Sequence, residues 1–356
     1  MALPRVLNGA IRSASAAADR GALRFMERAM RRNGVSRPPK DARQKLLGLA
    51  EHYRSVADDF FPEPDLPAVV EQKRSPRAGA RRVTDLSFES RWRPTVPMYV
   101  DEYASYRENL TARARMYASG DSPRPTAILI HGWGGGAYWL EERAFVVSYW
   151  LRIGFDVALM QLPFHGDRSP RQAVGRSGAL FPSPHLVRTN EAFGQSIFDL
   201  RALIKVLRDR GAPSIGVMGM SLGGYTTALL ATVVDDLAFA VPIIPAADMA
   251  RLMWRHGKDS PQRRRAEAVG VDGTLLQDVF RVHAPLHRAP RIPHERRMIV
   301  AGEGDRITTP DQARDLWSHW DEPAIHWFPG GHLAQIGRGD GFRAIRRHLS
   351  GLGIPR

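Results

Sequence analysis

Apolar positions change their spacing near residue 83, and this change divides the chain into two parts. Residues 1–80 favour helices joined by breakers, such as FPEPDLP at 61–67. The segments 83–92 and 109–118 then alternate apolar and polar positions, as half-exposed strands do. The pattern predicts an N-terminal helical extension over 1–80 and a second domain over 81–356 that begins with antiparallel strands.

From residue 126 onward, strand and helix alternate regularly. The central strands are continuous apolar runs, which is typical of strands buried on both faces of a parallel sheet. Alternation of this kind predicts the α/β class, with a mostly parallel central sheet flanked by helices. The expected strands are 126–132, 155–163, 214–221, 238–244, 297–303 and 323–329, and the expected helices are 138–152, 186–210, 222–234, 310–319 and 334–350.

Residue types that can take part in catalysis follow several of these strands. In an open α/β sheet, functional groups gather beyond the carboxyl ends of the strands. The glycine-rich run HGWGGG at 131–136 follows the first strand, and Ser221 follows the third. Asp305 and His332 follow the last two strands. A nucleophile, a carboxylate and a histidine therefore each come at the end of a different strand.

These three residue types have complementary chemistry. A serine hydroxyl is a poor nucleophile at neutral pH and needs a base within hydrogen-bond reach. His332 can take the proton, and a carboxylate on its other ring nitrogen would fix the tautomer and stabilise the imidazolium. Asp305 is the preferred carboxylate. Its rivals are Glu303, which would end the strand, and Asp311, which belongs to the first turn of the next helix.

Glycines surround the candidate nucleophile. The run GMSLG at 219–223 joins an expected strand directly to an expected helix. Small flanking residues let the neighbouring chain pass close to a sharp turn, and the first amides of the following helix would face developing negative charge. The alternative is a turn with a purely structural role. The residues at the ends of the other strands favour a turn that presents the Ser221 hydroxyl.

Four motifs together resemble a serine hydrolase of the α/β-hydrolase superfamily, on its esterase and lipase side. The resemblance extends over about 125–350 and rests on HGWGGG at 131–136, GMSLGG at 219–224, GEGDRITTP at 302–310 and PGGH at 329–332. It implies an α/β-hydrolase fold with a catalytic triad in the chain order serine, aspartate, histidine.

The resemblance also implies a role for each motif residue. Ser221 would be the nucleophile, Asp305 the acid and His332 the base. The backbone N–H groups of Trp133 and Leu222 would form the oxyanion hole. A serine nucleophile argues against the epoxide-hydrolase and dehalogenase branches of the superfamily, which need a carboxylate at that position.

A cap insertion is expected at about 246–296, where the superfamily commonly places one over the site. The segment is rich in arginine and histidine, and its apolar residues have helical spacing. Those residues can pack on the core, shape a substrate pocket as a lid, or do both.

Several further side chains are candidates for the substrate pocket. Gly134, Trp139 and His165 are the tentative pocket residues, although Trp139 can instead pack on the core and His165 can stabilise its loop. His131 is interpreted as a structural residue at the mouth of the glycine loop and not as a second base. The remaining histidines do not form a convincing metal set on one helix face, so we expect no metal and no cofactor.

Composition limits the class of protein. The chain has no cysteine, which excludes disulfides and thiol catalysis and fits a reducing compartment, so we expect a cytoplasmic protein. No apolar run is long enough to span a membrane, and Arg12, Asp19 and Arg20 interrupt the core that a secretory signal would need. The basic, alanine-rich N-terminus weakly resembles a transit peptide, but a surface helix is the preferred interpretation.

The net charge of +14 does not indicate nucleic-acid binding. Only five of the 51 basic residues are lysine, so arginine is favoured along the whole chain and no phosphate-binding stripe or nucleic-acid motif stands out.

We therefore expect a hydrolase that cleaves a carboxylic ester, an amide or a thioester of a small-molecule acyl substrate. The intermediate would be an acyl-enzyme on Ser221. The same triad serves acyltransferases and peptidases, and a catalytically silent binding protein on this fold is a further alternative. The sequence is compatible with a homo-oligomer, and no stable membrane insertion is expected.

Overall fold

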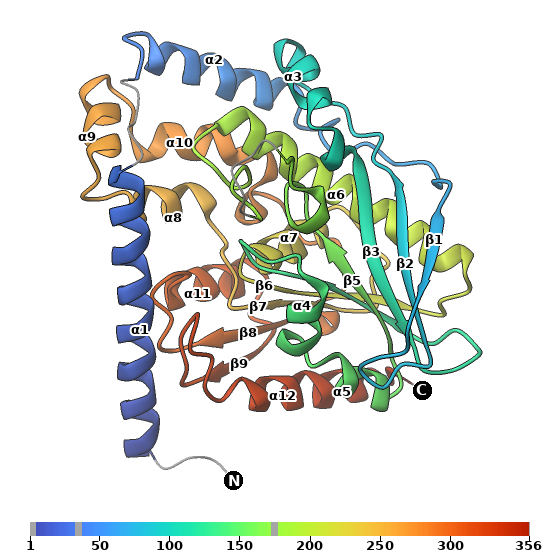
Figure 1. The fold of residues 1–356 in the computed structure, drawn as a ribbon. Coiled ribbons are helices and arrows are strands. Elements are labelled where there is room, and N and C mark those ends of the chain that lie inside the picture. The colour runs from blue at the N-terminus through green and yellow to red at the C-terminus, as the bar shows by residue number, and fades with distance from the viewer. Residues whose placement is uncertain (1–4, 33–37, 172–176, 356) are drawn as a thin grey trace.

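The computed structural model describes residues 5–32, 38–171 and 177–355, and a large sheet forms the centre of this part of the chain (Figure 1). Its strands follow the order β1-β2-β3-β5-β4-β6-β7-β8-β9. The ladders from β1 to β5 are antiparallel, and those from β5 through β4 to β9 are parallel. The predicted mostly parallel α/β sheet with an antiparallel start is therefore confirmed. The strands are β1 (Val70–Arg74), β2 (Arg82–Glu89), β3 (Thr111–Ala118), β4 (Thr126–Ile130), β5 (Asp156–Gln161), β6 (Ile215–Met220), β7 (Ala240–Ile243), β8 (Met298–Gly302) and β9 (Ala324–Phe328).

Helices pack on both faces of the sheet (Figure 1). None of the helices within the described ranges combines the length and the apolar character needed to cross a membrane. The helices are α1 (Arg5–Arg32), α2 (Ala42–Ser55), α3 (Val100–Ser105), α4 (Tyr138–Ala144), α5 (Val147–Arg152), α6 (Leu186–Asp209), α7 (Leu222–Leu230), α8 (Met249–His256), α9 (Pro261–Ala268), α10 (Gly273–Phe280), α11 (Pro310–His319) and α12 (Arg338–Gly351).

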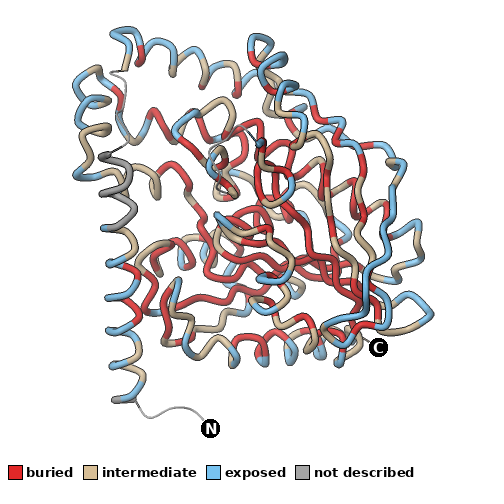
Figure 2. Tube along the Cα trace, in the orientation of Figure 1, coloured by how far each residue is buried: buried red, intermediate tan, exposed pale blue. Residues whose placement is uncertain are grey.

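Alternate residues of the central strands enter two separate cores. In β4, Ile128 and Ile130 belong to the core that includes α6, α7 and α11, whereas Ala127 and Leu129 belong to the core that includes α5 and α12. This division follows from the side-chain period of two in a strand. Both cores appear as buried chain through the middle of the molecule in Figure 2. The parallel strands from β4 to β8 are therefore buried along their whole length, because both of their faces are covered.

The extension expected to be helical over 1–80 contains a strand. β1 (Val70–Arg74) pairs antiparallel with β2 and forms one edge of the sheet. All five of its residues, VEQKR, are exposed, so the strand has no buried face and no apolar alternation that the sequence could display. The sheet thus begins before the boundary that the hydrophobic pattern indicates.

Other differences between expected and observed elements are small. The helix expected over 138–152 is two helices, α4 and α5, separated at Val146, whose φ of +52° lies in the left-handed region. The remaining elements from residue 126 onward agree with their expected bounds to within a few residues. Residues 246–296 contain three helices, α8 to α10, and α10 packs against α2 from the N-terminal part of the chain.

A buried ion pair connects the loop after β5 to α6. Arg168 and Asp199 have no exposed surface, and an Nη2–H of Arg168 donates to Asp199 Oδ2 at 2.7 Å. The Ser90 hydroxyl donates to the other carboxylate oxygen of Asp199 at 2.6 Å. Arg168 also donates to the carbonyl oxygens of Asn109 and Gln161. Four segments of the chain therefore converge on one charged pair inside the core.

We predict that Asp199→Ala lowers the free energy of unfolding by about 3–5 kcal/mol, because it leaves the Arg168 guanidinium buried without its counter-charge. The matched control is Asp236→Ala, which removes an ion pair to Arg208 whose two side chains are about half exposed. That change should cost at most about 1 kcal/mol. Urea unfolding measures both effects, and equal losses in the two variants would contradict the role of the buried pair.

Candidate active site

Ser221 occupies a strained turn between β6 and α7. Its backbone has φ +56° and ψ −111°, outside the regions that L residues ordinarily adopt. The turn is packed so closely that only glycine fits at positions 219 and 223. A Cβ atom on Gly219 would lie 2.1 Å from the Gly223 carbonyl oxygen, and one on Gly223 would lie 2.1 Å from the Ile130 carbonyl oxygen. The glycines of the predicted elbow are therefore required by close approach of β4, β6 and α7.

Asp305 and His332 lie together at the ends of β8 and β9. His332 Nδ1 is 2.8 Å from Asp305 Oδ2. Asp305 is buried, and its Oδ1 accepts the backbone N–H groups of Ile307 and Thr308, both at 2.8 Å. A carboxylate on Nδ1 holds the ring proton there and presents Nε2 as a proton acceptor. The arrangement is that of an orienting acid and a base.

The pKa values of the two partners move in opposite directions. Burial would raise the pKa of Asp305, but the nearby His332 and the hydrogen bonds from His332, Thr308 and Ile307 lower it below its ordinary value. Burial would lower the pKa of His332, but the charge of Asp305, their hydrogen bond and the charge of Asp19 raise it above its ordinary value. Both shifts favour an ionised Asp305 beside His332.

The Thr308 hydroxyl connects this pair to the segment that supports Ser221. It lies 2.9 Å from Asp305 Oδ2, 3.0 Å from His332 Nδ1 and 2.9 Å from the carbonyl oxygen of Ile244. The preceding residue, Ile243, accepts the backbone N–H of Ser221 at 2.9 Å. Within the described residues, the Ser221 hydroxyl makes no direct hydrogen bond to His332. The structure thus brings the three segments together at the carboxyl ends of the parallel strands. Two of the three side chains, those of Asp305 and His332, are in contact.

The rival carboxylates have other partners. Glu303 lies 3.7 Å from Arg12 of α1, and Asp311 lies 3.4 Å from Arg255 of α8. Both carboxylates are about half exposed, whereas Asp305 is buried against the His332 ring. Of these three, Asp305 is the one placed to orient His332.

The glycine-rich loop runs beside the turn at Ser221. A Cβ atom on Gly132 would lie 3.4 Å from Ser221 Cβ, in ordinary contact. Gly136 donates its N–H to Glu141 at 3.0 Å and accepts from the Gln161 amide at 2.7 Å. Gly136 has a φ of +102°, which only glycine adopts without strain. The loop is therefore held in one shape at the point where it passes Ser221.

Two buried histidines support this loop. His131 donates from Nδ1 to the Gly132 carbonyl oxygen at 2.8 Å, and its Nε2 accepts the backbone N–H of Leu162 at 3.1 Å. Burial lowers the pKa of His131 to about 4, so the ring stays neutral at pH 7. The His165 ring lies 4.9 Å from the His131 ring and has no exposed surface. His165 therefore offers no surface to a substrate. It is a tentative pocket residue in the sequence, whereas the structure buries it beside His131.

The other predicted loop residues lie nearer to solvent. Gly134 has a φ of +78° and, like Trp133, belongs to the turn that carries one expected oxyanion donor. The Trp133 indole is half exposed and donates to the Gly178 carbonyl at 2.8 Å, which ties the loop to the segment beyond β5. Trp139 is 56% exposed and lies against Arg143. Leu222 is the first residue of α7, where a backbone N–H has no intrahelical partner.

Helix α8, in the segment expected to form a cap, contacts the loop of the candidate acid. His256 Nε2 is 2.9 Å from the Ile307 carbonyl oxygen, and Arg255 donates to the Thr309 hydroxyl at 3.0 Å. The segment 246–296 therefore borders the site through the acid loop.

One residue at this site, Asp19 of α1, is not predicted from the sequence. Its carboxylate accepts the backbone N–H of His332 at 2.8 Å. The helical pattern gives no hint of this contact, because Asp19 is one of two acidic residues in a basic helix and its partner lies 313 positions further along the chain.

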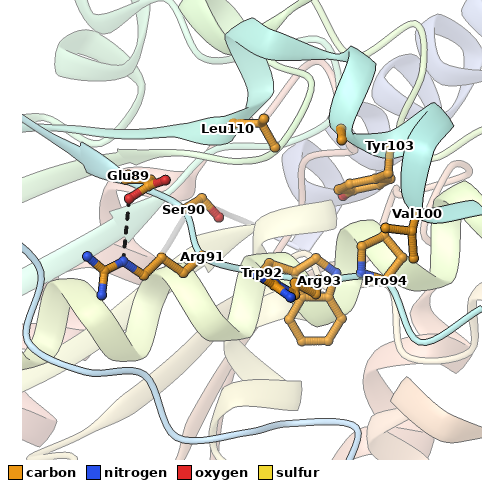
Figure 3. Close-up of a pocket in the computed structure, with 10 residues that line it drawn as sticks. Glu89, Ser90, Arg91, Trp92, Arg93, Pro94, Val100, Tyr103 and Leu110 are labelled. Carbon is orange, nitrogen blue, oxygen red and sulfur yellow. Dashed lines mark hydrogen bonds and ion pairs between the residues drawn. The ribbon is translucent and has the colours of Figure 1, made fainter. Parts of the chain in front are cut away.

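A cavity of about 550 Å³ opens elsewhere, between the end of β2 and α3 (Figure 3). Trp92 and Tyr103 form part of its wall, and Arg91 at its rim is paired with Glu89. It shares no lining residue with the segments of Ser221, Asp305 and His332. The candidate chemistry and this cavity are therefore separate features.

Comparison of the sequence with protein families identifies one match. The model described as "Alpha/beta hydrolase domain containing 18" matches residues 52–258. This range contains Ser221 and the glycine-rich loop, while Asp305 and His332 lie beyond it.

Two curated relatives come from Mycobacterium tuberculosis. The uncharacterized proteins Rv2627c of strain H37Rv and MT2702 of strain CDC 1551 are each 33% identical over 234 residues, which cover 62% of this chain and 54% of each relative. The chain thus spans about half the length of the curated relatives it matches.

Solved structures share the fold at low identity. An acetyl xylan esterase from Paenibacillus sp. R4 has a TM-score of 0.61 and 15% identity, covering 85% of this chain and 94% of the other. Acetyl xylan esterase 1 from Thermoanaerobacterium sp. JW/SL YS485 has a TM-score of 0.58 and 16% identity, covering 90% and 96%. At these identities the similarity shows the α/β-hydrolase fold alone.

We predict that Asp305→Asn lowers the pKa of His332, because it removes the nearby negative charge while the burial of the ring remains. The measurement is an NMR titration of isotope-labelled histidine, with the His332 signal assigned by its loss in His332→Gln. Asp311→Asn is the matched control and should leave the titration unchanged. A shift caused by Asp311→Asn, or none caused by Asp305→Asn, would contradict the pairing described above.

Proposed function

The chain belongs to the family described as alpha/beta hydrolase domain containing 18, and we propose that it is a serine hydrolase that cleaves carboxylic esters through an acyl-enzyme on Ser221. The observation that carries the proposal is the hydrogen bond between His332 and the buried Asp305, at the edge of the sheet where the strained turn presents Ser221. Esterase activity among proteins that share the fold supports the same class of reaction.

In the first step, Ser221 Oγ attacks the ester carbonyl carbon while His332 Nε2 takes the hydroxyl proton. Asp305 stabilises the imidazolium, and the carbonyl oxygen becomes an oxyanion. The backbone N–H groups of Leu222 and Trp133 would bind that oxyanion, each with an effect of about 10²–10³ in rate. When the intermediate collapses, the carbon–oxygen bond to the alcohol breaks and His332 returns its proton to the alcohol.

In the second step, His332 takes a proton from water and the resulting hydroxide attacks the acyl-enzyme. The acid leaves, and the proton passes back to Ser221 Oγ. Both steps need His332 to reach Ser221 Oγ, a contact that hydrolases commonly tighten when substrate binds. The elevated pKa of His332 strengthens it as a base. The chemistry uses only side chains and backbone amides, together with water.

Two parts of the chain would shape the substrate site. We assign the segment 246–296 the role of a cap, because α8 already contacts the acid loop through His256. Trp139 is exposed and lies on the helix that follows the glycine loop. We assign it the role of an apolar wall against which the acyl chain packs. Small acyl esters are therefore the first substrates to test.

We predict that the wild type hydrolyses p-nitrophenyl esters of graded chain length, and that Ser221→Ala lowers kcat by about 10³-fold or more. His332→Ala should cause a loss of similar size, and the double variant should be little worse than either single one, because the two residues act in one step. Release of p-nitrophenolate measures the rate. An esterase activity that survives Ser221→Ala at more than a tenth of the wild-type rate would exclude the acyl-enzyme on Ser221.

A further inference from the structure

Helix α1 reaches the candidate active site through one buried carboxylate. Asp19 has no exposed surface. Its Oδ2 accepts the backbone N–H of Arg306 at 3.0 Å and that of His332 at 2.8 Å, and its Oδ1 accepts the N–H of Leu333 at 3.0 Å. Burying a carboxylate is costly unless hydrogen bonds stabilise the charge, and here three amides do so.

These amides belong to two loops that are far apart in the sequence. Arg306 directly follows Asp305 in the loop after β8, and His332 and Leu333 belong to the loop after β9. The single atom Asp19 Oδ2 therefore bonds both loops, which are also joined directly where the backbone N–H of Gly304 donates to the Gly330 carbonyl oxygen at 2.9 Å. A second contact from α1 lies one helical turn away, where the Ser15 hydroxyl donates to the Ala334 carbonyl at 3.1 Å. The acid and the base therefore share a single anchor outside the sheet.

One glycine in each of these loops packs against α1. A Cβ atom on Gly331 would lie 2.7 Å from Asp19 Oδ2 and 3.1 Å from Ser15 Cβ. A Cβ atom on Gly304 would lie 3.0 Å from the Arg12 carbonyl oxygen. Neither glycine has a positive φ, so their backbone conformations alone do not demand glycine. Two motifs that resemble hydrolase signatures in the sequence thus also carry the surface on which α1 docks.

We propose that Asp19 is a positioning residue, which holds the loops of Asp305 and His332 in register so that the His332 ring stays aimed at Ser221. This inference rests on the proposed function. Loops are ordinarily the most mobile parts of a fold, and a displacement of about 1 Å at a catalytic group can cost about 10²-fold in rate. Anchoring both loops to one carboxylate restricts their relative motion.

The charge of Asp19 also acts on His332. Two carboxylates face the ring, Asp305 from the loop after β8 and Asp19 from α1. Two cations border the loops: Arg306 donates to the Asp305 carbonyl oxygen, and Arg338 of α12 donates to the Gln335 side chain in the loop after β9. Asp19 adds to the charge that favours the imidazolium. Its removal should therefore weaken the base as well as loosen its loop.

The test compares Asp19→Asn and Asp19→Ala with Arg12→Ala. Arg12 lies on the same helix and makes an ion pair to Glu303, with both side chains about half exposed, so Arg12→Ala perturbs the docking of α1 without touching the His332 loop. An asparagine keeps the shape of Asp19 but offers one oxygen in place of two and places an NH₂ group against backbone donors. Circular dichroism and thermal melting establish which variants fold.

We expect Asp19→Asn to lower kcat for a p-nitrophenyl ester by about 10- to 100-fold, with KM within about twofold of the wild type. The acid limb of the pH–rate profile should move to lower pH, because the pKa of His332 falls when the charge of Asp19 is lost. Amide hydrogen exchange should become faster in 303–308 and 330–336 and stay unchanged in the sheet. Arg12→Ala should match the wild type in all three measurements.

A folded Asp19→Asn protein with wild-type kcat and wild-type exchange in both loops would overturn the inference. An equal loss in Arg12→Ala would also overturn it, since that result assigns the effect to docking of the helix in general. If the wild type hydrolyses no ester, the proposed function fails, and hydrogen exchange alone then decides whether Asp19 orders the two loops. The two failures are therefore distinguishable.

Discussion

The architecture of the site depends on the close contact between α7 and the strands β4 and β6. This contact leaves no room for a side chain at Gly219 or Gly223, and it fixes the backbone of Ser221 at a φ of +56°. A conformation of this kind costs about 1–3 kcal/mol and persists only where the surrounding structure holds it in place. The two apolar cores provide that support, because the central strands are covered on both faces. The conformation that presents the Ser221 hydroxyl therefore depends on the packing of the folded sheet.

Asp305 and His332, the proposed acid and base, are assembled around this fixed point by hydrogen bonds that cross the ends of the strands. The backbone N–H of Ser221 bonds the carbonyl of Ile243, and the next carbonyl, that of Ile244, meets the hydroxyl of Thr308 beside Asp305 and His332. The Asp19 carboxylate bonds backbone N–H groups in the same two loops, those of Arg306 and His332. A helix from the beginning of the chain, three strand ends and the turn at Ser221 thus form one connected network. The network brings residues more than 300 positions apart in the sequence into direct contact.

The sequence predicts the centre of the fold well because buried parallel strands carry their signal in every residue. The runs at 126–130 and 215–220 are buried at every position and almost entirely apolar, and the motifs after them are local. β1 has no such signal, since each of its residues is exposed. The burial of His165 follows from tertiary packing against His131 and cannot be derived from its own segment. The contacts of Asp19 are equally invisible, because its partners are backbone amides, which have no sequence identity.

The most direct test of the account is the site of covalent modification by a fluorophosphonate. This reagent reacts with serine hydroxyls that are activated by a neighbouring base. Incubation of the folded wild type, followed by peptide mapping with mass spectrometry, should find a single phosphonylated residue, Ser221, and labelling should disappear in both Ser221→Ala and His332→Ala. Absence of labelling on the folded wild type, or a modified residue other than Ser221, would contradict the account.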